Sequence, residues 1–214
     1  MLKMLIDGLL DTLYMTLIAT FAAYLIGLPI GISLVVTDSE GIKPMPIYNK
    51  VMGIIVNIIR SVPFLILMIA LMPYVRLLIG TGIGTSATVT VLIVAATPFV
   101  ARMVEGSIKE VDPGVIEAAQ SMGASNMDII RKVMLLEARP ALLVGAAVST
   151  ITILGYSAMA GVVGGGGLGD IAIKYGLYRY ETKTMWITVI ILVIIVQLFQ
   201  EIGYIVAKKF DNRI

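Results

Sequence analysis

The sequence Glu117-Ala118-Ala119-Gln120-Ser121-Met122-Gly123 is a polar stretch between two strongly apolar parts of the chain. It lies within a segment, 102–140, that holds five basic and six acidic side chains. The chain as a whole is 58% hydrophobic and has a mean hydropathy of +0.98. A charged side chain in lipid costs several kcal/mol, so this segment must lie in water on one side of a membrane.

Long apolar runs on both sides of this segment have the length of membrane-spanning helices, which need about 20 apolar residues. Backbone groups in lipid must be paired within each span, which favours helices over strands. The sequence therefore predicts an all-α integral membrane protein, with 1–214 as one transmembrane domain and 105–139 as a cytoplasmic segment. The five predicted spans are at about 13–36, 50–72, 84–104, 140–160 and 184–207. Pro29, Pro63 and Pro98 predict kinks in the first three.

The placement of Lys and Arg predicts the orientation of these spans. Ten basic residues, counting Arg213, fall on the side of the polar segment, and five fall on the other side. Positive charge is enriched in cytoplasmic loops, so the polar segment and the C-terminus are expected inside and the N-terminus outside. This organisation is typical of a multi-pass protein of a bacterial cytoplasmic membrane.

Composition excludes several classes of function. The chain has no Cys and no His, which excludes thiolate and imidazole metal sites and the usual nucleophile-base pairs. Its net charge of +2 gives no indication of nucleic-acid binding. It contains no G-x-x-x-x-G-K-[ST] sequence, so any ATP must be hydrolysed by a partner. Five spans without an internal repeat predict that a symmetric pathway needs a second copy of the chain.

Helix-capping signals divide the polar segment into two short helices. Asp112 followed by Pro113 predicts a helix that runs to Met122, and Gly123 is placed to end it in a left-handed conformation. Ser125, with Asp128 three residues later, predicts the start of a second helix that runs to about Glu137. In the first helix Val115, Ala119 and Met122 share a face. We expect this face to dock on a partner; the alternative is a polar loop on the bilayer surface.

Glu117-Ala118-Ala119 followed three residues later by Gly123 resembles the EAA motif of permease subunits of ATP-binding-cassette importers. The family's usual Leu-Pro pair is replaced by Leu135-Leu136, with Pro140 further on. Three further stretches and a glycine run resemble the methionine-importer subfamily: 60–64, 98–105, 155–159 and 164–169 with Tyr175-Gly176.

The resemblance implies a homodimer whose short helices couple to two cytoplasmic ATPase subunits, which bind ATP-Mg. The permease chain itself binds no cofactor. An extracytoplasmic methionine-binding protein or lipoprotein would deliver the substrate. Glu117 is then a charged docking contact, Ala118, Ala119 and Met122 a close-packing surface, and Gly123 the hinge.

Three further sets of residues are singled out. Tyr156, Ser157 and Met159 are pathway or gate residues by the resemblance; otherwise Met159 is one of 13 methionines that fill the core. Glycines 164, 166 and 169 match a dinucleotide-loop spacing without the required strand and helix, so a simple turn or a gating loop remains. Arg60 and Glu201 lie inside predicted spans, where we expect an internal ion pair; binding of a substrate carboxylate is the alternative.

The resemblance thus implies the permease subunit of a methionine importer that works by alternating access. Related importers of other amino acids, such as cystine, or of methionine derivatives remain open. A self-contained channel or secondary transporter is the rival class, and it calls for several intramembrane acids.

Overall fold

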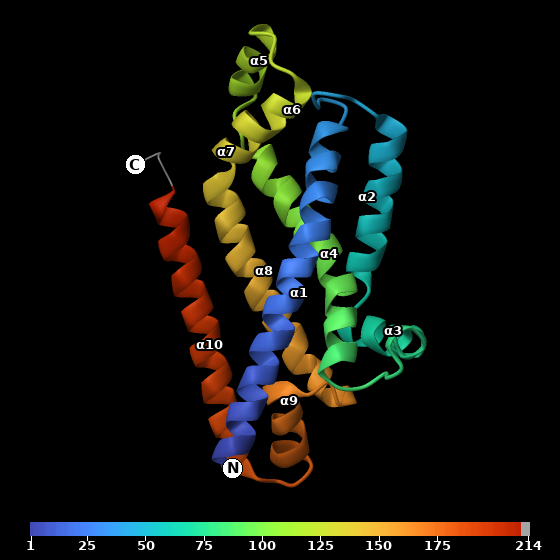
Figure 1. The fold of residues 1–214 in the computed structure, drawn as a ribbon, viewed down its shortest axis with the longest axis vertical. Coiled ribbons are helices and arrows are strands. Elements are labelled where there is room, and N and C mark those ends of the chain that lie inside the picture. The colour runs from blue at the N-terminus through green and yellow to red at the C-terminus, as the bar shows by residue number, and fades with distance from the viewer. Residues whose placement is uncertain (211–214) are drawn as a thin grey trace.

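The computed structural model describes residues 1–210 as a bundle of helices, with no strand among them (Figure 1). Arg213, counted above in the charge bias, lies outside the described residues. The long helices are α1 (Leu2–Val36), α2 (Pro46–Ser61), α3 (Phe64–Ile79), α4 (Thr85–Lys109), α8 (Arg139–Ala160) and α10 (Thr182–Lys209). The short elements are α5 (Pro113–Ser121), α6 (Asn126–Asp128), the π-helix Ile129–Met134, α7 (Leu135–Glu137), the 3-10 helix Gly161–Val163, α9 (Gly167–Ile171) and the π-helix Ala172–Leu177.

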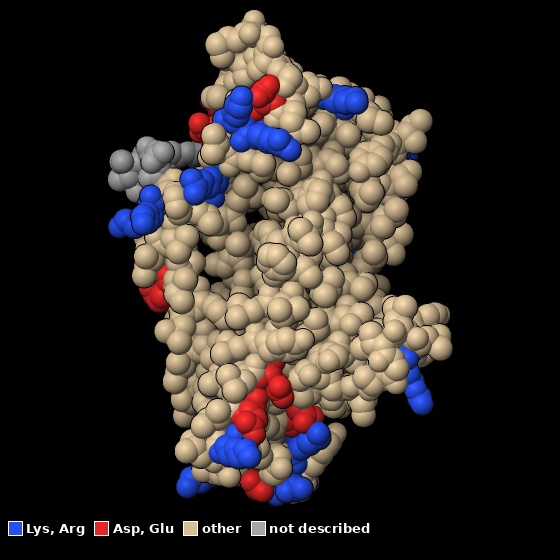
Figure 2. All heavy atoms as spheres, in the orientation of Figure 1, with Lys and Arg blue, Asp and Glu red and all other residues tan. Residues whose placement is uncertain are grey.

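The bundle has two polar ends. The α5–α7 segment and the end of α10 lie at one end, and the N-terminus and α9 lie at the other (Figure 1). Lys, Arg, Asp and Glu side chains gather at these two ends and leave a broad, nearly uncharged band between them (Figure 2). Within the described residues, four helical segments are long and apolar enough to cross a membrane, or five if a bent pair is one span. This distribution fits a multi-pass membrane protein.

The bent pair is formed by α2 and α3, which meet at 102°. Val62 between them is extended, with φ −79° and ψ 125°, because proline disfavours a helical conformation in the residue before it. Pro63 then begins α3 as its N-cap. The sequence predicted one kinked span here, whereas the structure has two helices. Pro29 and Pro98 behave differently and lie inside the continuous helices α1 and α4.

The most extensive helix packing is between α1 and α4, and small residues make it possible. A Cβ added at Gly27 would lie 2.9 Å from the Thr97 carbonyl oxygen, and one at Gly31 would lie 2.6 Å from that of Ala101. The two backbones therefore touch directly, as small residues allow between membrane helices. α1 begins at Leu2 rather than near residue 13. At 1.5 Å per residue its 35 residues are longer than the roughly 30 Å hydrocarbon core, so its first turns extend beyond it.

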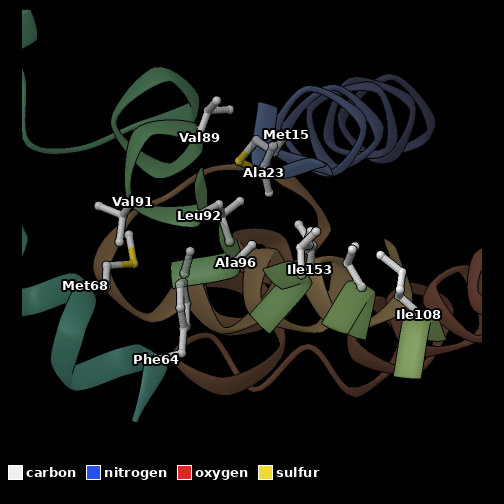
Figure 3. Packing of buried hydrophobic residues seen from close by; sticks show 14 of the residues in the cluster. Met15, Ala23, Phe64, Met68, Val89, Val91, Leu92, Ala96, Ile108 and Ile153 are labelled. Carbon is white, nitrogen blue, oxygen red and sulfur yellow. The ribbon is translucent and has the colours of Figure 1, made fainter. Parts of the chain in front are cut away.

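The larger of two hydrophobic clusters joins these helices to the polar segment. Met15 and Ala23 of α1, Phe64 of α3 and Leu92 of α4 pack with Ile153 of α8 (Figure 3). The same cluster continues through Ile108 into the short helices, where its members are Val111, Ala119, Ile129, Met134 and Ala138. The α5–α7 segment is therefore fixed to the bundle rather than loosely tethered.

Candidate functional site

The α5–α7 segment projects from one end of the bundle and is held by local capping (Figure 1). The Gly114 amide donates to Asp112 Oδ1 at 2.7 Å, which caps α5 as the sequence predicts. α5 ends at Ser121, and Gly123 has φ +77°, a conformation that glycine adopts without strain. The following helix starts at Asn126 after its cap Ser125, whose side chain accepts from the Asp128 amide.

The exposed face of α5 is not quite the one that the sequence predicts. Val115, Glu117, Ala118 and Met122 are exposed, and Met122 is 80% accessible. Ala119 is only 5% accessible, because it packs into the core of its own chain. The expected role of Ala119 as a surface for a partner is therefore wrong. Its small side chain instead lets α5 lie close to the bundle.

A cavity of about 620 Å³ lies beside α5, between this helix and the ends of α1 and α4. Glu117 and Gln120 line it from α5, and Asp38, Glu40 and Lys109 line it from the bundle. Lys109 Nζ donates to Asp38 Oδ2 at 2.7 Å. This hydrogen bond lowers the pKa of the Asp38 carboxyl below its usual range, so Asp38 stays ionised near neutral pH. No ion pair to Glu117 is formed among residues 1–210.

Lys109 belongs to a chain of polar contacts that reaches α2. It also pairs with Glu105 at 3.1 Å, and Glu105 accepts from Arg102 at 2.6 Å. Arg102 Nη2 donates to the Gly53 carbonyl at 3.1 Å and to Asn57 Oδ1 at 3.0 Å. This polar network joins the loop after α1, the last turns of α4 and the middle of α2. The cavity beside α5 is thus connected to a helix that ends at the Pro63 break. The apolar pattern of the sequence does not predict this network, although the i, i+3 and i, i+4 spacing of 102, 105 and 109 indicates local pairing.

The predicted gate residues lie near the end of α8, each in a different setting. Tyr156 stacks on Phe64 of α3, with ring centroids 4.7 Å apart and 3° between the planes. Ser157 is buried and donates to the Leu154 carbonyl at 2.8 Å. Met159 is 51% accessible. Helical geometry continues through Gly155 to Ala160, so these residues lie on one regular helix that packs beside the Pro63 break.

The glycine run after α8 is a tightly packed turn rather than a free loop. Gly164, Gly166 and Gly167 have positive φ. The Gly84 amide donates to the Gly164 carbonyl at 3.0 Å. Thr12 Oγ1 accepts from the Leu168 amide at 2.8 Å, which ties the turn to α1. The sequence left a simple turn and a gating loop as alternatives for this run. Its close packing favours the simple turn, which closes this end of the bundle.

Arg60 and Glu201 do not pair within one chain. Both side chains are exposed, Arg60 beside Phe99 and Met103 of α4, and Glu201 in a groove between α8 and α10. α2 and α10 lie on opposite sides of the bundle with α4 and α8 between them (Figure 1). The expected internal ion pair is therefore absent because the two helices are not neighbours.

Comparisons with known proteins agree over nearly the whole chain. Residues 23–214 match the family described as binding-protein-dependent transport system inner membrane component. The probable D-methionine transport system permease protein MetI of Vibrio cholerae is 46% identical over 210 residues, which cover 98% of this chain and 93% of the relative. The D-methionine transport system permease protein MetI of Escherichia coli K12 is 44% identical over 161 residues, or 75% and 74% of the two chains.

Solved structures of transporters share the fold. A structure described as inward facing conformations of the MetNI methionine ABC transporter superposes with a TM-score of 0.97 at 42% identity, covering 99% of this chain and 98% of that chain. An amino acid ABC transporter with histidines superposes with a TM-score of 0.80 at 25% identity, covering 97% and 94%.

Proposed function

This chain belongs to the family of binding-protein-dependent transport system inner membrane components, and from that premise we propose that it is the permease subunit of an ATP-binding-cassette importer of methionine. The observation that carries the proposal is the likeness, over nearly the full length, to permeases named for D-methionine transport. The helical membrane fold with a projecting helical segment is the architecture that such a role needs.

In the proposed assembly two copies of the chain form the pathway, and two ATPase subunits dock on the two α5 helices. ATP with magnesium binds to those separate subunits, and an extracytoplasmic binding protein delivers methionine. Closure of the ATPase pair draws the α5 helices together, and the bundles rock between inward-open and outward-open states. Reversing the ratio of these two states from 1:99 to 99:1 needs a partner that binds one state about 5.5 kcal/mol more tightly than the other. This difference in binding free energy must come from the ATPase subunits.

Within this chain, Glu117 is the charged docking contact, and Val115, Ala118 and Met122 form the packing surface around it. Exposure of all four side chains supports the assignment. Gly123 ends α5 and sets the angle to the next helix. The polar network from Asp38 to Asn57 then carries a displacement of this end into α2.

The end that carries α5 is assigned to the cytoplasm and the N-terminal end to the outside. The excess of Lys and Arg at the α5 end supports this orientation. Arg131 and Lys132 are exposed there. They are placed to contact either the ATPase or anionic lipid headgroups.

One comparison bears on which substrate the assembly carries. The amino acid transporter with histidines has the same fold, so the fold alone does not select methionine. Import of cystine or a methionine derivative by the same assembly is the alternative. A self-contained secondary transporter is disfavoured, because Glu201 is the one acidic residue within the five predicted spans.

We assign Met159, with Tyr156 and Ser157, to the gate at the outer end of the pathway. Replacing Met159 by alanine is expected to leave the chain folded, since the side chain is half exposed. Removal of its flexible thioether is expected to open a leak, seen as methionine flux into proteoliposomes without ATP. Ile190→Ala, a similarly exposed residue on α10, is the control. Uptake by Met159→Ala that stays fully ATP-dependent at the wild-type rate would remove Met159 from the gate.

Affinity purification of the tagged chain from its native membranes in mild detergent, with mass spectrometry of the proteins retained, tests the proposed class of protein. We expect an ATPase subunit in a 1:1 ratio to the chain. Recovery of the chain alone, as a stable oligomer that transports without a partner, would instead support the secondary transporter.

A further inference from the structure

Arg60 and Glu201 lie at the two ends of one continuous groove across the bundle. A cavity of about 280 Å³ between α2 and α4 is lined by Arg60, Arg102 and Met103. The next cavity, between α4 and α8, shares Arg102 and Met103 with the first and extends to Val144. A third cavity of about 590 Å³, between α8 and α10, shares Val144 and contains Glu201. The groove therefore runs across the four helices in the order α2, α4, α8, α10.

This groove lies on the face of the bundle away from α1. α1 packs on α4 and α8 and crosses them in Figure 1, yet it contributes no lining residue to any of the three cavities. The groove face is thus uncovered in one copy of the chain. Apolar residues line most of the cavity between α8 and α10, whereas Arg102, Glu105, Lys109 and Glu110 also line the two cavities beside α4. Arg102, Glu105 and Lys109 are paired within the chain. The groove carries the exposed guanidinium of Arg60 at one end and the exposed carboxylate of Glu201 at the other.

The two charges lie at about the same depth along the bundle. Arg60 lies beside Phe99 and Met103 of α4. Met103 in turn packs on Gly145 of α8, where an added Cβ would lie 3.5 Å from Met103 Cε. On the other flank of α8, Gly203 of α10 is in direct contact with Ala147. Glu201 is two residues from Gly203 along α10. Following these contacts from helix to helix places Arg60 and Glu201 within about one helical turn, ~5 Å, of the same level.

A twofold axis along the membrane normal keeps depth and exchanges the two ends of the groove. When two such faces oppose each other, α2 of one copy meets α10 of the other, and the contact occurs twice. We propose that Arg60 of each chain pairs with Glu201 of the second copy, so that the two charges seal both edges of the dimer. This inference rests on the two-copy assembly of the proposed function.

The charge complementarity is what selects a second copy as the occupant of the groove. An unpaired arginine or carboxylate at this depth is costly, and the cost falls when unlike charges meet with hydrogen bonds. Within residues 1–210 of one chain neither side chain has an ionic partner. The second copy supplies both partners at once.

The natural absence of cysteine makes crosslinking a direct test. Copies with two different tags are co-expressed, one carrying Arg60→Cys and the other Glu201→Cys, and membranes are treated with a short bis-maleimide. This reagent suits the site better than a disulfide, which needs Cα atoms 4.4–6.8 Å apart, because an Arg–Glu pair spans more. We expect a covalent dimer that carries both tags. Ile58→Cys and Ile202→Cys are the controls, exposed positions on the same turns that do not line the groove, and they are expected to give none.

Exchanging the charges at residues 60 and 201 provides a second test, in which the fraction of dimer in detergent is measured. Arg60→Glu is expected to lose dimer in detergent, and Arg60→Glu combined with Glu201→Arg is expected to restore it. No crosslink above the controls, or no restoration by the double variant, would overturn the pair. ATPase recovery from the same samples separates the two proposals. An ATPase bound to a chain that does not crosslink contradicts the pair alone, and a crosslinked dimer that retains no ATPase contradicts the proposed function alone.

Discussion

Replacing Glu117 by arginine is expected to abolish recovery of the ATPase subunit with the purified chain. The side chain is exposed on α5, in a segment fixed to the bundle by Ala119, Ile129 and Met134. Reversal of a charge at a docking surface costs at least about 2 kcal/mol, which is a roughly 30-fold loss of affinity. The measurement is the ratio of ATPase to tagged chain after purification in mild detergent.

Glu137→Arg is the matched control, because it makes the same charge change at an exposed acid at the base of the same segment. We expect this variant to retain the ATPase at the wild-type ratio. Produced without the ATPase subunit, both variants should elute at the same volume in size-exclusion chromatography, since neither side chain is part of the core. Equal ATPase recovery by the two variants would show that α5 is not the docking element.

Gly169→Ala is expected to prevent the end of the bundle that carries α9 from forming. A Cβ at Gly169 would collide with the backbone carbonyl of Ala158 in α8, and Gly161 and Gly169 are themselves in direct backbone contact. Both neighbours are backbone, so they cannot move aside as a side chain does. We expect a large loss of folded chain, measured as the monodisperse fraction after detergent extraction, and a lower midpoint of thermal unfolding.

Gly155→Ala separates this steric effect from the general effect of adding a methyl group to a helix. Gly155 lies in α8 itself, and a Cβ there meets no atom within 4 Å. Alanine is favoured over glycine in a helix by up to about 1 kcal/mol, so this variant should be as stable as the wild type or more so. A Gly169→Ala protein as stable as Gly155→Ala would contradict the packing of the glycine turn.

Local signals in the sequence predicted the local features of the structure. Asp112, Gly123 and Ser125 cap or end helices where expected, because a cap depends on hydrogen bonds within a few residues. Apolar runs located the long helices for a similar reason, since length and hydropathy are properties of one segment. α1 begins ahead of the span predicted at about 13–36, because Lys3, Asp7 and Asp11 lower the hydropathy of its first turns without ending the helix.

Features that depend on neighbours distant in sequence were not predictable from local patterns. Ala119 looked like a docking surface because a small residue serves equally well against a partner or against the chain's own core. Pro29 predicted a kink in the first span, whereas the local pattern did not show that Gly27 and Gly31 on either side of it allow the approach of α4. Arg60 and Glu201 were matched by charge and depth alone, and only the order of the helices shows that they lie on opposite flanks.

The polar network suggests how docking at α5 reaches the pathway. Asp38, Lys109, Glu105 and Arg102 link the cavity beside α5 to α2, and α2 ends at the Pro63 break, where Phe64 stacks on Tyr156 of the proposed gate. The proposed docking end and the proposed gate are thus joined by contacts that belong to this one chain. A displacement of α5 can therefore be transmitted to Phe64 and Tyr156 through a continuous series of packed and hydrogen-bonded groups.

Methionine uptake into proteoliposomes tests the central claim most directly. The chain is reconstituted with its ATPase subunit and binding protein, and accumulation of labelled methionine is followed with and without ATP on the side of the α5 helices. We predict accumulation that needs ATP and the ATPase subunit, and that unlabelled methionine competes away. Accumulation by the chain alone, or ATP-driven uptake that methionine does not compete with, would contradict the account.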